Sequence, residues 1–451
     1  MLLTRDKTFY QTLARLAIPI ALQNLLSFAI GFAGNLMVGS LGDVAISGVY
    51  MGNQPQTFLM MLVGGTNGAL LILSSQYWGR NDVKSIKKVI SIGSVFTIAP
   101  SILFSIVSVV FSTQIVGIFT RDAQVIAEGA GYLHIAGMSY VLFAVSQLLI
   151  SAMRSVETAK VGMYISFSAL FVNVVLNYAL ILGRLGFPAL GIKGAAIATL
   201  ISRMVELVIA AVYLFMIDKK LNMKLRDFLH FDRLLLRDFV RYGLPMVGGN
   251  VVWSVNMMVS SAILGRFDAG VISAASVSGM LSSLISIWMD GLAASVGVIT
   301  GKTVGAGLYE KMKEYAKTVQ VIFVFIGVCS GLIIFLLRWP FISLYNITEN
   351  ARFFSAQFIS VIAVSTVGTC YQASCLFGLV KSGGDVSFVF KNDAIFVFGV
   401  VLPSAIVATL LGAPPWIVFA CLKCDQILKC AVAYIKINSF NWMKNLTRDT
   451  A

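Results

Sequence analysis

The stretches LARLAIPIALQNLLSFAIGFAGNLMV (Leu13–Val38) and FVRYGLPMVGGNVVWSVNMMVSSAIL (Phe239–Leu264) decide the fold, because they are two versions of one apolar segment placed 226 residues apart. Each is long enough to cross a hydrocarbon core about 30 Å thick. The gapless match extends beyond them and keeps mainly Arg, Pro, Asn, Gly and Lys: Arg15 with Arg241, Pro19 with Pro245, Asn24 with Asn250, Gly39 with Gly265, Gly65 with Gly291, Gly79 with Gly305 and Lys87 with Lys313. The pattern predicts a duplicated membrane protein.

The composition agrees with this prediction. The 451 residues are 58% apolar and only 12% charged, and the mean hydropathy is +0.87. A soluble domain carries about twice that charged fraction. The apolar runs predict an all-α integral membrane protein with twelve transmembrane helices at 13–38, 45–75, 86–111, 124–152, 161–182, 191–217, 244–265, 271–301, 318–337, 353–380, 389–411 and 415–436. The first run is too long for a signal-peptide core, so we interpret it as a retained span.

The net charge of +14 reflects topology and not an affinity for nucleic acid. Twelve spans place both termini on one side, and about three quarters of the 34 Lys and Arg residues lie on that side. The opposite side holds only six basic residues: Arg121, Arg184, Lys193, Arg266, Arg338 and Arg352. The positive-inside rule therefore predicts cytoplasmic termini in a multi-pass protein of a bacterial inner membrane.

The predicted organisation is two homologous six-helix lobes. The first lobe covers 1–217, a cytoplasmic linker covers 218–243, and the second lobe covers 244–451. An even number of spans in each repeat gives both lobes the same orientation, as in transporters built from parallel repeats. Such a pair of lobes suits alternating access, in which a cavity opens to one side of the membrane at a time.

Several segments resemble the MATE family, the multidrug and toxic compound extrusion transporters. The resemblance covers nearly the whole chain and rests on the combination of segments, since none is specific alone. The segments are NLMVGSLGDVAISGV (Asn35–Val49), QYWGRNDVKSIKKV (Gln76–Val89), NVVLNYALILGRLGFPALGIKGAAIATLISR (Asn173–Arg203), GLPMVGGNVVWSVN (Gly243–Asn256), GKTVGAG (Gly301–Gly307) and KSGGD (Lys381–Asp385).

The resemblance implies a V-shaped pair of lobes that exports amphipathic organic compounds, or a specialised metabolite, by antiport with Na⁺ or H⁺. It implies a monomer in the bilayer, with no cofactor other than the coupling ion. The chain departs from the family at three positions where many members carry an acid: Gly34, Asn177 and Asn250. The first-lobe proton site of those members therefore cannot operate here through the same acids.

Acids at membrane depth are costly and are candidates for ion coupling. Four attract attention in the predicted spans: Glu128, Glu206, Asp290 and Asp425. Asp290 has no basic residue near it in sequence, so it must bind a monovalent cation, carry a proton or pair with another helix. At about 1.5 Å per residue, Asn250 lies at a similar depth on the preceding span. Asn256 is a weaker candidate for the same site.

The other charged residues in the spans are spaced as local pairs. Arg203 precedes Glu206 by three residues, and Asp425 precedes Lys429 by four, with Lys423 nearby. Such spacings place both partners on one helix face, which leaves a structural and a functional role open. The first lobe carries neutral polar residues suited to cavity lining or to hydrogen bonds between helices: Gln23, Asn24, Asn173 and Asn177.

Two other functions were weighed against antiport. A flippase for lipids or lipid-linked saccharides needs a cationic cavity, but only Arg203, Lys423 and Lys429 are basic residues away from the ends of the spans. Two of these three have an acid three or four residues away. An integral membrane transferase needs clustered acids for Mg²⁺–diphosphate or a His/Asp pair, and no span carries either pattern. The sequence therefore favours an ion-coupled exporter and no enzyme.

Overall fold

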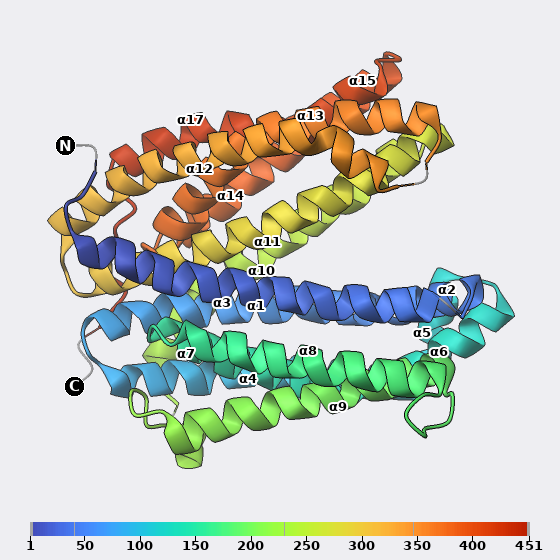
Figure 1. Cartoon of the computed structure of the whole chain (residues 1–451). Helices are drawn as coiled ribbons and strands as arrows, with labels where there is room; N and C mark the ends of the chain where they lie inside the picture. The colour runs from blue at the N-terminus through green and yellow to red at the C-terminus, as the bar shows by residue number, and fades with distance from the viewer. Residues whose placement is uncertain (1–2, 40, 230, 346, 449–451) are drawn as a thin grey trace. The chain divides into compact units, whose positions relative to one another are not determined.

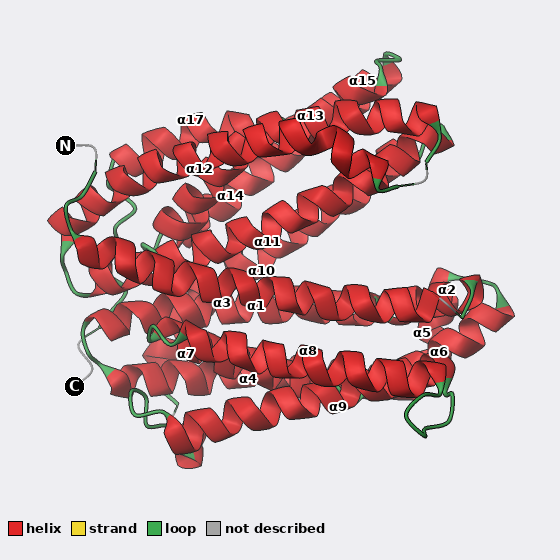
Figure 2. Cartoon of the chain, viewed as in Figure 1, coloured by secondary structure: helices red, strands yellow, loops and turns green. Residues whose placement is uncertain are grey.

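The computed structural model describes residues 3–39, 41–229, 231–345 and 347–448, and within them every regular element is a helix (Figure 2). The helices of the first half are α1 (Lys7–Gly39), α2 (Asp43–Gly52), α3 (Gln54–Gly79), α4 (Val83–Val110), α5 (Ser112–Phe119), α6 (Ala123–Gly137), α7 (Tyr140–Ser155), α8 (Ala159–Leu182) and α9 (Gly191–Val212). The π-helical turn η1 (Tyr213–Ile217) and the 3₁₀ segment η2 (Leu225–Leu229) follow.

The second half continues from α10 to α17 (Figure 1). Its helices are α10 (Arg233–Leu264), α11 (Ala269–Gly305), α12 (Tyr309–Ser343), α13 (Glu349–Gln372), α14 (Val386–Phe396), α15 (Leu402–Leu410), α16 (Pro415–Lys423) and α17 (Asp425–Asn438). Two π-helical segments, η3 (Ala373–Lys381) and η4 (Val397–Val401), extend α13 and α14. A membrane interior offers no water to backbone amides, so helices that satisfy their own hydrogen bonds are the expected element.

The helix boundaries reproduce the repeat seen in the sequence. The helices α1, α2, α4 and α6 begin at residues 7, 43, 83 and 123, and α10, α11, α12 and α13 begin 226 residues later, at 233, 269, 309 and 349. The halves differ in detail, because α2 and α3 are separated at Asn53 whereas α11 is continuous. The expectation of two homologous halves is therefore borne out.

The contacts divide the chain into two compact units whose boundaries also follow the repeat. Unit 1 contains residues 1–21 and 248–449, and unit 2 contains residues 22–247. The boundaries after residues 21 and 247 are again 226 residues apart. The predicted division at 218–243 follows chain order, whereas the contacts assign the beginning of α1 to unit 1 and the beginning of α10 to unit 2.

Two glycines allow these long helices to pack closely. A Cβ atom on Gly291 of α11 would lie 2.8 Å from the Cα of Ala21 on α1, within unit 1. A Cβ atom on Gly65 of α3 would lie 3.0 Å from the Cα of Val247 on α10, within unit 2. Small residues at such crossings let helix backbones approach in a membrane, where dispersion and not the hydrophobic effect drives association.

The amino-terminal segment is attached to α12 within unit 1. The Asp6 carboxylate pairs with Lys311 Nζ at 2.8 Å and accepts a hydrogen bond of 2.5 Å from the Tyr315 hydroxyl. The ammonium of Lys311 lowers the pKa of Asp6 well below its usual value. The Thr4 amide also donates to the Thr318 hydroxyl at 2.8 Å. These contacts explain why the start of α1 belongs to unit 1.

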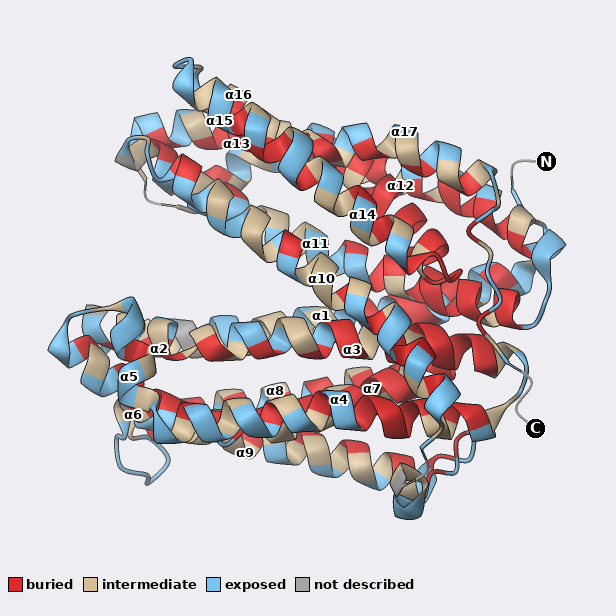
Figure 3. Ribbon diagram, turned by 180° about the vertical axis from the view of Figure 1, so that it is seen from behind, coloured by how far each residue is buried: buried red, intermediate tan, exposed pale blue. Residues whose placement is uncertain are grey.

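Ten helices in the described part of the chain are long and apolar enough to cross a membrane, and the pair α6 and α7, bent by 46°, gives an eleventh. The twelfth predicted span, 415–436, is helical but divided at Cys424 into α16 and α17, each shorter than a full span. Exposed residues follow the helices along their length and are not confined to the ends (Figure 3). A bilayer would cover this surface.

We expect Gly291→Ala to lower the thermal stability of the purified protein, because the new methyl group would press on the α1 backbone. Overpacking of this kind costs about 1–3 kcal/mol. Gly279→Ala is the matched control, since the same helix has nothing within 4 Å of an added Cβ there. Melting of both variants in detergent checks the expectation, and equal midpoints would show that the crossing does not require glycine.

Candidate functional site

A buried charged triad lies in unit 1, where α14 and α17 contribute one lysine and two aspartates (Figure 1). Lys429 Nζ lies 2.9 Å from Asp393 Oδ1 and 3.0 Å from Asp425 Oδ2. The side chains of Lys429 and Asp425 are each 6% exposed, and that of Asp393 is 15% exposed. Charges at this depth need partners, because desolvation is costly for each ion.

Amide and hydroxyl groups extend the triad to α13. Gln426 Nε2 donates to both Asp425 carboxylate oxygens, at 3.1 and 3.0 Å. The Gln426 Oε1 atom accepts from the Thr369 hydroxyl at 3.1 Å and from Gln372 Nε2 at 3.0 Å. The network thus connects three helices through polar atoms within a largely apolar bundle.

The triad contains two carboxylates and one ammonium, so in its fully ionised form it carries one excess negative charge. Lys381, at the end of η3, interacts electrostatically with Asp393 and with Asp290. Burial of an excess charge favours uptake of a proton or of a cation. The Lys381 ammonium offsets part of this excess charge.

Asp393 was not among the acids selected from the sequence, although it lies within the predicted span 389–411. Its neighbours Lys391 and Asn392 make the start of that span resemble a solvated end. Its partner Lys429 is 36 residues away, which local spacing does not reveal. The sequence signal that marks it is its position within the predicted span 389–411.

Asp290 lies on α11, one residue before the crossing glycine Gly291. The notion of an acid enclosed within the predicted span 271–301 is wrong for Asp290, because its side chain is exposed. The reason is that α11 is only partly enclosed, with 22% of its most apolar window buried. Among the described residues Asp290 has no ion pair, and Lys381 interacts with it only through longer-range electrostatics. The lack of a close cationic neighbour leaves its coupling role open.

The two asparagines predicted beside Asp290 lie on α10. Both are half-buried, and the backbone oxygen of Asn250 accepts from the Ser254 hydroxyl at 2.7 Å. The side-chain oxygen of Asn256 is enclosed without a hydrogen-bond donor. An unsatisfied amide oxygen of this kind is a potential cation ligand. The shared depth of Asn250 and Asp290 stays a prediction.

In unit 2, the predicted pair Arg203 and Glu206 lies on α9. Arg203 Nη1 lies 2.5 Å from Glu206 Oε2, and Gln147 Nε2 of α7 donates to Glu206 Oε1 at 3.3 Å. The Arg203 guanidinium also lies 4.8 Å from the centre of the Phe143 ring. Both oxygens of the buried glutamate are thus occupied, which suits a structural role for this pair.

The neutral polar residues of unit 2 form hydrogen bonds between helices. Asn177 Nδ2 donates to Asn173 Oδ1 at 2.8 Å, and Asn173 Nδ2 donates to the Ser202 hydroxyl at 3.3 Å. A Cβ atom on Gly34 would lie 3.7 Å from Asn177 Nδ2. Two positions at which family members can carry acids are therefore adjacent, and both are neutral here.

Gln23 and Asn24 differ in their environment on α1. Gln23 is buried and its Oε1 atom accepts from Arg154 Nη2 of α7 at 2.6 Å, whereas Asn24 is half-buried. Arg154 lies in the last turn of α7, and its enclosed Nε atom has no hydrogen-bond acceptor. Gln23 is therefore a partner for a charged group and not simply a cavity-lining residue.

Lys423 ends α16 and makes no ion pair among the described residues, while its neighbour Asp425 is bound by Lys429. Its ammonium lies 6.0 Å from the centre of the Phe419 ring.

The described residues contain no group of three His, Cys, Asp or Glu arranged to hold a metal ion. A coupling cation would therefore need amide, hydroxyl or main-chain oxygens in addition to a carboxylate.

Comparisons with known proteins agree with this geometry. The sequence model of the family MatE matches residues 19–179 and 245–407, one match in each half. The probable multidrug resistance protein YoeA of Bacillus subtilis is 22% identical over 88% of this chain and 86% of its own length. The multidrug resistance protein NorM of Vibrio vulnificus is 24% identical over 92% of this chain and 90% of its own length.

Solved structures share the fold. The crystal structure of MATE in complex with MaL6 has a TM-score of 0.86 at 17% identity, covering 95% of this chain and 96% of that one. The eukaryotic MATE transporter AtDTX14 has a TM-score of 0.82 at 19% identity, covering 97% of both chains. The fold expected from the sequence is confirmed by these similarities.

We expect Lys429→Met to destabilise the protein by about 3–5 kcal/mol, because it would leave two buried carboxylates without their cation. Replacing all three charges, with Asp393→Asn, Asp425→Asn and Lys429→Met together, should recover much of that loss. Lys391→Met is the control, since Lys391 is exposed on the same helix as Asp393. Unfolding midpoints in detergent are the measurement, and a Lys429→Met midpoint equal to the control would contradict the triad's role.

Proposed function

The chain belongs to the MatE family, whose members are transporters and not enzymes, and on this premise we propose that it is an antiporter exporting amphipathic organic compounds in exchange for Na⁺ or H⁺. The names of the relatives in Bacillus and Vibrio, both multidrug resistance proteins, support export as the direction of transport. The proposal includes a specialised metabolite as a member of the same substrate class, and a monomer as the working unit.

We propose a bacterial inner membrane as the location and the cytoplasm as the side of both termini. The charge distribution supports this orientation, because basic residues gather on the side of the termini. The opposite side of the membrane carries few basic residues. Two of them are Arg184, in the connection from α8 to α9, and Lys193, in the first turn of α9. In this orientation the inward ion gradient of the cell can drive export.

Asp290 is the residue on which the coupling proposal depends. It is an acid within a long apolar span, and no described residue neutralises it through an ion pair. A carboxylate without an ion pair exchanges a proton or a monovalent cation more readily than a carboxylate that is paired with a lysine. Occupancy of Asp290 would change the charge facing Lys381, which interacts with both Asp290 and Asp393. The triad would thereby sense the bound ion.

The mechanism follows from differential binding. An ion that binds one access state more tightly than the other shifts the population between them, and export is driven when the substrate prefers the opposite state. The coupling free energies of such pairs typically correspond to factors of about 5 to 150 in affinity. Neutralising Asp290 removes the ion's differential interaction without removing the substrate cavity.

We expect Asp290→Asn to lose ion-driven efflux by about tenfold or more while it still binds substrate, a loss within the usual range of coupling energies. The measurement is dye efflux from reconstituted vesicles under an imposed Na⁺ gradient and, separately, under an imposed pH gradient. Loss under only one gradient identifies the coupling ion. Glu128→Gln is the matched control, because Glu128 is an exposed acid on α6.

Normal efflux by Asp290→Asn under both gradients would disprove the assignment of this residue. If Lys429→Met also transported normally, the triad would have no part in coupling. Resistance of an efflux-deficient host to a panel of cationic dyes and antibiotics would separate a multidrug exporter from one dedicated to a single metabolite.

A further inference from the structure

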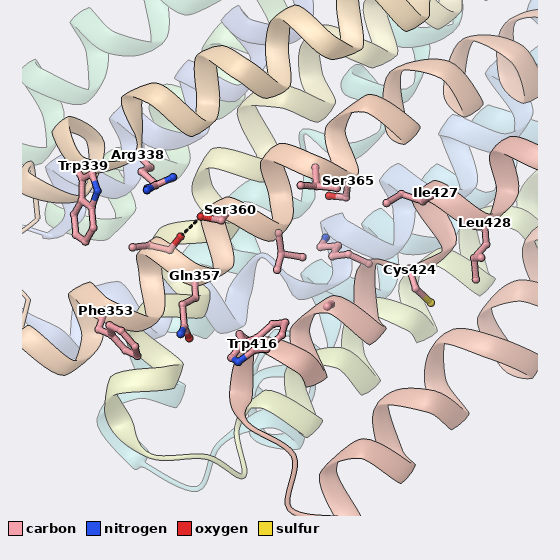
Figure 4. Close-up of a pocket in the computed structure, with 15 residues that line it drawn as sticks. Arg338, Trp339, Phe353, Gln357, Ser360, Ser365, Trp416, Cys424, Ile427 and Leu428 are labelled. Carbon is pink, nitrogen blue, oxygen red and sulfur yellow. Dashed lines mark hydrogen bonds between the residues drawn. The ribbon is translucent and has the colours of Figure 1, made fainter.

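A long groove follows α13 on the surface of unit 1, between α12 on one side and α16 and α17 on the other. It comprises two cavities of about 760 and 780 Å³ that share Val364 and Ile427 as lining residues. Figure 4 shows the first cavity, with Trp339 and Phe353 toward one end, Ile427 and Leu428 toward the other, and Trp416 between them. The two cavities are therefore one continuous feature.

The lining is apolar, and much of it is uncovered. Val364 is 61% exposed, Ile427 is 47% exposed and Leu428 is 49% exposed. Trp339, near the end of α12, and Trp416, near the start of α16, are both about half exposed. Tryptophan is enriched where a membrane's hydrocarbon meets its headgroups. The groove thus has the chemistry of a site for acyl chains, with an interfacial rim at its aromatic end.

Two cations distinguish this groove from an ordinary lipid-facing surface. Arg338 lies five residues before the end of α12, and Lys423 lies eight residues after the start of α16. At about 1.5 Å per residue, both lie within roughly 12 Å of the same membrane surface, inside one leaflet. The fifteen residues that line the first cavity include these two cations and no Asp or Glu.

Several polar atoms in the first cavity lack partners. The Arg338 Nη1 atom is enclosed without a hydrogen-bond acceptor, although its guanidinium lies 3.8 Å from the centre of the Phe335 ring. The Gln357 Oε1 atom is likewise enclosed and unsatisfied. Lys423 has no ion pair in the described part of the chain, and Asp425 beside it is bound to Lys429. An enclosed donor without an acceptor is costly, so the unsatisfied Arg338 guanidinium favours an anion beside it.

We propose that this groove binds an anionic phospholipid, with the phosphate between Arg338 and Lys423 and an acyl chain along Val364 and Ile427. A guanidinium and an ammonium complement a phosphate through charge-assisted hydrogen bonds. The amide of Gln357 complements a hydroxyl on the headgroup, as in a glycerol headgroup. A zwitterionic headgroup would bring its own ammonium toward the two cations, so the site discriminates by charge. This inference does not depend on the transported substrate.

The test uses the full-length protein in nanodiscs made from equal amounts of phosphatidylglycerol and phosphatidylethanolamine, both with the same acyl chains. The lipid that stays bound after detergent extraction is measured by mass spectrometry. Each basic residue near an anionic membrane surface raises the binding affinity for anionic lipid about fivefold. We therefore expect wild type to retain phosphatidylglycerol preferentially, and the double variant Arg338→Gln with Lys423→Gln to lose about 25-fold of that preference.

Arg352→Gln is the matched control, because Arg352 is an exposed cation on α13 near the same end but does not line the groove. It should keep the wild-type preference. Added phosphatidylglycerol should also raise the melting temperature of wild type and not that of the double variant. Equal retention of both lipids by wild type would overturn the proposal, and so would stabilisation by a soluble amphiphilic anion without any preference for phosphatidylglycerol.

Discussion

The close approach of α1 to α11 at Gly291, and of α10 to α3 at Gly65, is the contact on which this architecture depends. In each case an added methyl group would meet the neighbouring backbone at 2.8 to 3.0 Å. Helices can approach so closely only where a side chain is absent. Because each crossing joins residues from both repeats, each compact unit contains a segment that the chain order assigns elsewhere.

The same membrane environment explains how charge is distributed inside the units. A carboxylate in hydrocarbon must be paired, hydrogen-bonded or exchangeable. In unit 2, Glu206 forms an ion pair with one arginine and accepts a hydrogen bond from one glutamine, so the charge of this glutamate is balanced locally. Unit 1 instead combines Asp393, Asp425 and Lys429, and adds Asp290 without a close partner. The two units therefore have similar helix arrangements and differ in how their charged side chains are paired.

Local features of this structure could be predicted from the sequence, and long-range ones could not. The spans, their duplication and the Arg203–Glu206 pair follow from periodicity and spacing along one helix. The partnership of Asp393 with Lys429 joins residues on different helices, which spacing does not encode. The exposure of Asp290 likewise depends on which face of α11 is covered by neighbours. Both facts arise from packing between helices and not from the pattern of any single segment.

The sharing of α1 and α10 has a consequence for how such a protein is made and how it arose. A polypeptide broken between η2 and α10 would give two pieces, and neither would hold a whole compact unit: Gly65 would lack its partner on α10, and Gly291 its partner on α1. A single six-helix ancestor could reach the same packing only as a dimer in which the first helix of each copy packs against the other copy. Gene fusion would then have joined two chains that already depended on one another.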